Sequence, residues 1–204
     1  MAFIDNLAYS LFMLSFAGFI LLYTISSVYM AYRKNKKDFG VYLRSAGVPL
    51  GLIGAYMLIV GLWGQFTWPL PGSYNILFYD PFISFGILLM GFALSVRYNV
   101  RLEYVGFLGL LVGVMVIIYG IEGYGIGLTS APMALLGLYF LYGVTGILSY
   151  PVALVVERLP GLKKNPWIGW YILIALFWIV LLFASLLAGY IGSAAISSHL
   201  ISPP

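Results

Sequence analysis

The chain has 204 residues, of which 63% are hydrophobic and only 8% are charged. Its mean hydropathy of +1.04 excludes an ordinary soluble globular domain and indicates a membrane protein. The formal net charge is +4, and the absence of cysteine excludes disulfides, thiolate metal sites and a cysteine nucleophile. One histidine, His199, cannot supply the two axial ligands that haem usually takes in a membrane bundle.

Six apolar stretches follow one another along the chain. A membrane-spanning helix needs about 20 apolar residues. We therefore predict an all-α membrane protein in which residues 1–204 form a single domain of six transmembrane helices. The predicted helices span about residues 7–31, 47–66, 76–96, 104–120, 131–156 and 166–191.

All ten basic residues lie in alternate connections between the predicted helices. They are Arg33, Lys34, Lys36, Lys37, Arg44, Arg97, Arg101, Arg158, Lys163 and Lys164. By the positive-inside rule these connections face the cytoplasm, which predicts a multi-pass protein of the plasma membrane with both termini extracytoplasmic. We favour this orientation signal over the alternative that the basic clusters bind anionic lipids or nucleotides.

Glycines recur with one spacing in two of the predicted helices. Gly47, Gly54, Gly61 and Gly64 return in the fourth helix as Gly106, Gly113, Gly120 and Gly123. Pro81 with Gly86 in the third helix also matches Pro132 with Gly137 in the fifth. A helical hairpin therefore appears twice, and pairing of the sixth helix with the first would give three similar hairpins around a central pore. Ordinary packing of helices through small residues is the alternative.

Four short segments resemble the AmiS/UreI family of six-helix urea and amide channels. They are FYDP at residues 78–81, LYGV at 141–144, LPGLK at 159–163 and NPW at 165–167. The chain also looks like archaeal membrane proteins of similar build. The resemblance implies a pore in each subunit, a hexameric ring of subunits, and passive passage of small neutral solutes through aromatic constrictions.

Two residues of the predicted fifth helix are pore candidates through this resemblance. Tyr142 falls where the family has its first pore tryptophan, and Gly146 falls where the second stands. Tyr139 lies one turn before Tyr142, away from either membrane interface. Its ring either packs between helices or lines a pore.

Four positions in the predicted third and sixth helices follow from the same resemblance. Leu89 and Ala93 occupy the positions of an aromatic pair, and a shift of a few residues brings Phe92 to the first of them instead. Ile172 replaces a glutamate of the family. An uncharged, aromatic path of this kind would reject hydrated ions and admit small neutral molecules.

Two carboxylates lie near the predicted hydrocarbon region, where ionisable groups are functional suspects. We expect Asp80, which precedes a proline near the start of the third helix, to be a helix cap. Glu122 lies at the outer end of the fourth helix. It is either a wet interfacial carboxylate or a titrating group at an external vestibule.

We therefore expect a passive channel for small neutral solutes, such as urea, amides, ammonia or weak acids, in the form of a homo-oligomer with a hexamer favoured. We expect no enzyme activity, cofactor, bound metal or nucleic acid, because Asp80, Glu122 and His199 share the outer side without a recognised catalytic spacing. The alternative is an accessory or structural subunit of a larger membrane complex, since glycine-spaced helices and an uncharged outer loop also suit a partner surface.

Overall fold

The computed structural model describes residues 6–34, 40–159 and 167–201, with side-chain surroundings up to residue 196. Within these residues the chain forms six α-helices. They are α1 (Asn6–Arg33), α2 (Gly40–Thr67), α3 (Tyr74–Tyr98), α4 (Leu102–Gly125), α5 (Pro132–Arg158) and α6 (Ile168–Ile201). Each is long and apolar enough to span a membrane, which confirms the predicted all-helical class.

α2 and α6 extend furthest beyond their predicted ends. α2 begins at Gly40 rather than near Gly47, so Arg44 lies in its second turn. α6 continues to Ile201 rather than ending near residue 191. Both extensions contain polar residues that hydropathy assigns to loops, but they contain no proline, so the helical hydrogen bonds continue.

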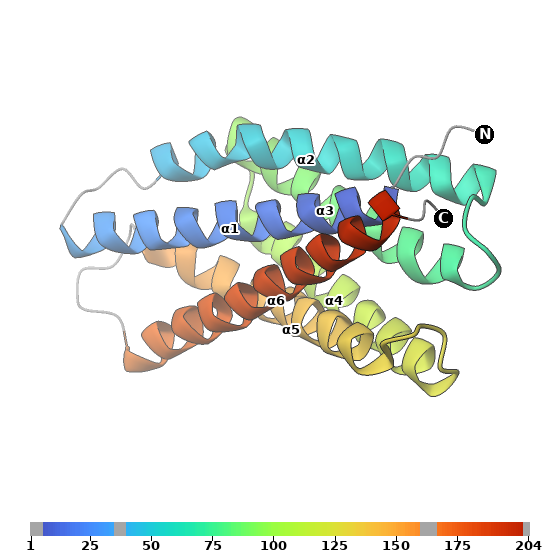
Figure 1. The fold of residues 1–204 in the computed structure, drawn as a ribbon. Helices are drawn as coiled ribbons and strands as arrows, with labels where there is room; N and C mark the ends of the chain where they lie inside the picture. Colours follow the sequence, from blue (N-terminus) through green and yellow to red (C-terminus); the bar gives the residue numbers. More distant parts are fainter. Residues whose placement is uncertain (1–5, 35–39, 160–166, 202–204) are drawn as a thin grey trace.

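The six helices form a closed ring in chain order. Each helix packs against its neighbours in the chain, and α6 packs against α1. The most extensive contacts are those of α2 with α3, α4 with α5, and α1 with α6. α1 begins at the end of the bundle where α6 finishes (Figure 1). The structure therefore contains three helical hairpins, one of which joins the first and last helices.

The two ends of the ring differ in charge. α2, α4 and α6 begin at the end that carries Arg33, Arg44, Arg101 and Arg158, which we call the basic end. α1, α3 and α5 begin at the other end, which we call the terminal end because α1 starts and α6 finishes there (Figure 1).

Glycines of α2 and α4 allow their returning helices to approach closely. A Cβ atom at Gly54 would lie 3.0 Å from the carbonyl oxygen of Gly86 in α3. At Gly113 it would lie 2.7 Å from the amide nitrogen of Ile147 and still closer to the carbonyl oxygen of Gly143, both in α5. Any side chain would meet backbone atoms that cannot rotate away, so this spacing requires glycine.

The third hairpin uses serine at the corresponding contact. Ser15 Oγ in α1 donates a hydrogen bond to the carbonyl oxygen of Ser185 in α6 at 2.8 Å, and Ser185 also faces Gly18. Ser185 therefore stands where α2 and α4 have Gly54 and Gly113. The three hairpins share one packing register although their small residues differ.

These contacts correct the expected match between α3 and α5. Gly86 packs on α2 and Gly143 packs on α4, whereas Gly137 lies against Leu187 of α6. The match of Gly86 with Gly137 was therefore wrong, because the glycines of α5 that face its hairpin partner are Gly143 and Gly146. Counting from the first proline of each helix did not reveal which glycine faces the partner.

Candidate functional site: cavities along the ring axis

Three cavities follow one another through the ring. The terminal cavity has a volume of about 50 Å³, the central cavity about 200 Å³ and the basic cavity about 450 Å³. Leu14, Phe85 and Tyr142 line both the terminal and the central cavity. Leu43 and Leu102 line both the central and the basic cavity. The cavities therefore adjoin, and a few side chains separate each from the next.

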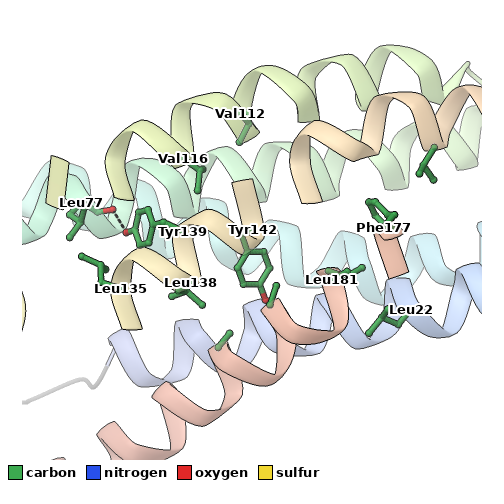
Figure 2. Packing of buried hydrophobic residues seen from close by; sticks show 13 residues of the cluster. Leu22, Leu77, Val112, Val116, Leu135, Leu138, Tyr139, Tyr142, Phe177 and Leu181 are labelled. Atoms are coloured by element: carbon green, nitrogen blue, oxygen red, sulfur yellow. Dashed lines mark hydrogen bonds between the residues drawn. The ribbon is translucent and has the colours of Figure 1, made fainter. Parts of the chain in front are cut away.

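The separation between the terminal and central cavities is a constriction of three side chains. Leu14 comes from α1, Phe85 from α3 and Tyr142 from α5, so each hairpin contributes one residue. The Tyr142 hydroxyl donates to the carbonyl oxygen of Leu14 at 3.2 Å, and its ring centroid lies 5.6 Å from that of Phe85. Figure 2 shows Tyr142 projecting from α5 into the packed core. These contacts close the axis at this level.

All six helices contribute to the wall of the central cavity, and the described residues of this wall carry no charge. Its polar side chains include Thr24, Thr145 and Ser149, and each hydroxyl donates to a backbone carbonyl oxygen of a helix. Phe92 and Phe177 add aromatic surface. The wall therefore offers few groups that would replace the hydration shell of an ion.

A cross-helix hydrogen bond stabilises the wall of the terminal cavity. α3 continues through Pro81, which has no N–H to donate to the carbonyl oxygen of Leu77 four residues earlier. Tyr139 of α5 donates its hydroxyl to that oxygen at 2.5 Å (Figure 2). The phenol replaces the helical donor that the proline lacks, so Tyr139 has a packing role and also lines the cavity.

Five of the seven predicted pore residues line an axial cavity. Tyr139 lines the terminal cavity, and four line the central cavity: Leu89, Phe92, Tyr142 and Gly146. Gly146 also faces α4, where a Cβ atom would lie 2.7 Å from the carbonyl oxygen of Gly109. Helix packing therefore requires glycine at this position, and the lack of a side chain also leaves open space in the cavity beside it.

Ala93 and Ile172 line none of the three axial cavities. Ala93 faces α2, where its backbone lies 3.7 Å from the place that a Cβ atom of Gly47 would take. Ile172 is 62% exposed on α6. Their expected position on the axis was wrong, because a register taken from short apolar motifs does not fix which face of a helix turns inward. In α3, Phe92 lines the central cavity and its neighbour Ala93 does not.

Asp80 is not a helix cap, which corrects the prediction. α3 begins at Tyr74 with Ser73 before it, so Asp80 lies in the second turn of the helix. Its carboxylate accepts hydrogen bonds from the Tyr119 hydroxyl at 2.7 Å and from the Gln65 amide at 2.6 Å. The Asp80 side chain therefore links α3 to both α4 and α2.

Glu122, expected either as a wet interfacial carboxylate or as a titrating group at a vestibule, is exposed on α4 and lines none of the three axial cavities. The side chain of His199 lies outside the described residues. Among the described part of the chain, no group of three or more His, Cys, Asp or Glu side chains is placed to hold a metal ion.

Leu14 and Phe85 are the functional candidates that the sequence did not single out. Each precedes the residue of its helix that faces the hairpin partner, as Tyr142 does in α5. The correct register of the repeat would have aligned all three. Apolar residues carry no other signal in helices that are apolar on every face.

A ring of six apolar helices with successive cavities along its axis defines a multi-pass membrane protein. Residues 1–202 match the family described as protein of unknown function (DUF981), and the chain belongs to that family. No curated protein and no solved structure matches it.

Proposed function

We propose that the axial cavities form a closed conduit for small uncharged solutes, with one conduit in each chain. The succession of three adjoining cavities through the ring carries this proposal. Protein interiors are normally packed to the density of organic crystals. A bundle that served only as a structural subunit would therefore be expected to fill its axis with side chains.

The chemistry of the wall supports a neutral solute. Arginines and a glutamate line the basic cavity, whereas none of the described residues that line the terminal and central cavities is charged. A charge moved into such surroundings without a partner loses several kcal/mol of hydration energy. Small molecules without charge lose much less, so the wall favours them.

The constriction supports a conduit that is closed in this conformation. Leu14, Phe85 and Tyr142 come from three hairpins, and only one hydrogen bond, from Tyr142 to the Leu14 carbonyl, is found among them. A small change in the position of one hairpin, or a rotation of one ring, would join the two cavities. Solute size would then be selected at this level.

The resemblance to the AmiS/UreI channels supports the same solute class, which comprises urea, amides, ammonia and neutral weak acids. It also underlies our proposal of a homo-oligomeric ring, with six subunits favoured, in the plasma membrane. A monodisperse monomer both in mild detergent and in nanodiscs would contradict the oligomer and leave the conduit to be judged by transport.

The conduit is tested by solute uptake into liposomes that contain the purified protein. Stopped-flow light scattering with urea, acetamide and glycerol reports uptake at matched protein density. Tyr142→Ala removes the side chain that closes the axis, so we expect uptake of the larger solutes to rise severalfold. Phe140→Ala is the matched control, because Phe140 lies on the same helix with 54% of its surface exposed. We expect this control to behave as the wild type.

A second pair of variants separates conduction from loss of stability. Leu88→Trp adds bulk to the wall of the central cavity and should reduce uptake of every solute. Tyr142→Phe keeps the ring and removes the hydroxyl that donates to the carbonyl oxygen of Leu14, so it should fold and raise uptake less than Tyr142→Ala. Equal uptake by wild type, Tyr142→Ala and Leu88→Trp would refute the conduit and favour the accessory-subunit alternative.

A further inference from the structure

The central cavity differs from its two neighbours in size and in chemistry. Its volume of about 200 Å³ compares with about 50 Å³ for the terminal cavity and about 450 Å³ for the basic cavity. An apolar cavity of roughly 150 Å³ inside a protein stays dry and binds benzene or xenon. The terminal cavity is smaller than this, and arginines and a glutamate line the basic cavity. Of the three, the central cavity therefore best fits an apolar molecule of this size.

The hydroxyl groups in the wall of the central cavity already donate their hydrogen atoms. The described residues of this wall that carry a hydroxyl are Thr24, Tyr142, Thr145 and Ser149. Each donates to a backbone carbonyl oxygen, at 2.7, 3.2, 2.8 and 2.6 Å in that order. A hydroxyl has a single hydrogen, so these groups can only accept a further hydrogen bond. A buried water needs about two to four polar partners, and these side chains offer it acceptors alone.

Aromatic rings from three helices also line this cavity. They are Phe85 and Phe92 of α3, Tyr142 of α5 and Phe177 of α6. Aromatic rings attract one another in offset or edge-to-face arrangements. Several leucines, among them Leu88, complete the apolar surface. A planar hydrocarbon would therefore find ring contacts as well as aliphatic contacts in this cavity.

Contacts within the hairpins hold the wall in place. Gly18 and Gly146 line the cavity and also face the partner helix of their hairpin. A Cβ atom at Gly18 would lie 3.1 Å from Cβ of Ser185, and one at Gly146 would lie 2.7 Å from the carbonyl oxygen of Gly109. Helices that already touch at these points cannot move closer together to fill the space. The cavity is therefore formed before any molecule binds, which lowers the cost of binding.

We propose that the central cavity binds one small apolar molecule, such as an aromatic hydrocarbon dissolved in the bilayer. Such a molecule gives up no hydrogen bonds on entering, and it contacts a wall whose hydroxyl hydrogens are already engaged. The proposal does not depend on conduction through the ring, because binding requires only the cavity and its wall. Binding and solute uptake are measured separately, so failure of one proposal leaves the other to its own test.

The test compares the wild type with two variants that introduce the same side chain on α3. Leu88→Trp fills part of the central cavity. Leu94→Trp is the matched control, because Leu94 is 50% exposed and lines none of the three axial cavities. The full chain is placed in nanodiscs of phosphatidylcholine, and tryptophan fluorescence follows its thermal unfolding. One series adds benzene, and the other adds pyridine in an alkaline buffer that keeps it uncharged, at matched concentrations in the bilayer.

We expect benzene to raise the unfolding temperature of the wild type and of Leu94→Trp. The apparent affinity of Leu88→Trp for benzene should be at least tenfold lower. Pyridine should bind the wild type severalfold more weakly than benzene, because its nitrogen loses a hydrogen bond from water that the engaged hydroxyls do not replace.

If Leu88→Trp does not fold, Leu88→Phe is measured with Leu94→Phe as its control. Three results would each overturn the proposal: equal responses of the cavity and control variants, a response to pyridine as strong as that to benzene, or no response of the wild type to benzene.

Discussion

The contact between α4 and α5 predicts a large difference between two glycine-to-alanine substitutions. At Gly113 the new Cβ atom would lie 2.7 Å from the amide nitrogen of Ile147 and 3.0 Å from the carbonyl carbon of Gly146. Backbone atoms cannot move aside singly, so the two helices must separate. Overpacking of this kind costs about 1–3 kcal/mol.

Gly137 in α5 supplies the control. Its Cβ atom would meet the nearest side-chain atom, Cδ2 of Leu187, at 3.6 Å, which is an ordinary contact. Alanine is favoured over glycine inside a helix by about 0.5–1 kcal/mol, so Gly137→Ala should be neutral or stabilising. Both substitutions gain this preference, so it cancels, and the two variants should differ by roughly 1–3 kcal/mol in their free energy of unfolding.

Equilibrium unfolding in mixed micelles measures this difference. Dodecyl sulfate is titrated into each purified variant, and tryptophan fluorescence follows the transition. If Gly113→Ala proves as stable as Gly137→Ala, α4 and α5 do not approach as closely as the structure shows. The packing register that we assign to the three hairpins would then be contradicted as well.

Two further predictions concern the wall of the terminal cavity and the orientation of the protein in the membrane. Tyr139→Phe leaves the buried carbonyl oxygen of Leu77 without a donor, so it should cost about 1–3 kcal/mol of unfolding free energy in the same titration. Tyr79→Phe is its control, because among the described residues the Tyr79 hydroxyl makes no hydrogen bond of normal geometry, so its loss should cost much less. For orientation, a cysteine in place of Ser73 should react with an impermeant maleimide on intact cells, and one in place of Val100 only after permeabilisation. The opposite labelling pattern would reverse the predicted orientation.

Part of this fold follows from the sequence because close helix contacts leave a regular trace. Gly54 and Gly113 stand at equivalent positions of α2 and α4, and each faces the helix that follows it. The pairing of α1 with α6 was expected only because it would complete a third hairpin like the other two. Its contact uses Ser15 and Ser185, which glycine spacing does not detect.

The constriction was predicted in part, and the missing part has a physical cause. Tyr142 was singled out by the resemblance and by its hydroxyl group, which is unusual in the middle of an apolar helix. Leu14 and Phe85 could not be singled out, since lipid-facing and axis-facing residues are both apolar.

The prediction for Asp80 was wrong because its local sequence carried a strong but misleading signal. An Asp-Pro pair suggests a helix start locally, but α3 begins at Tyr74, ahead of the pair.

The alternation of extensive and sparse contacts around the ring has a mechanical consequence. Glycine and serine contacts lock the two helices of each hairpin, so motion within a hairpin would cost far more than motion between hairpins. The molecule then consists of three rigid hairpins joined by three less extensive contacts. Because each hairpin carries one side chain of the constriction, we expect a tilt of any one hairpin to change the width of the axis at this level.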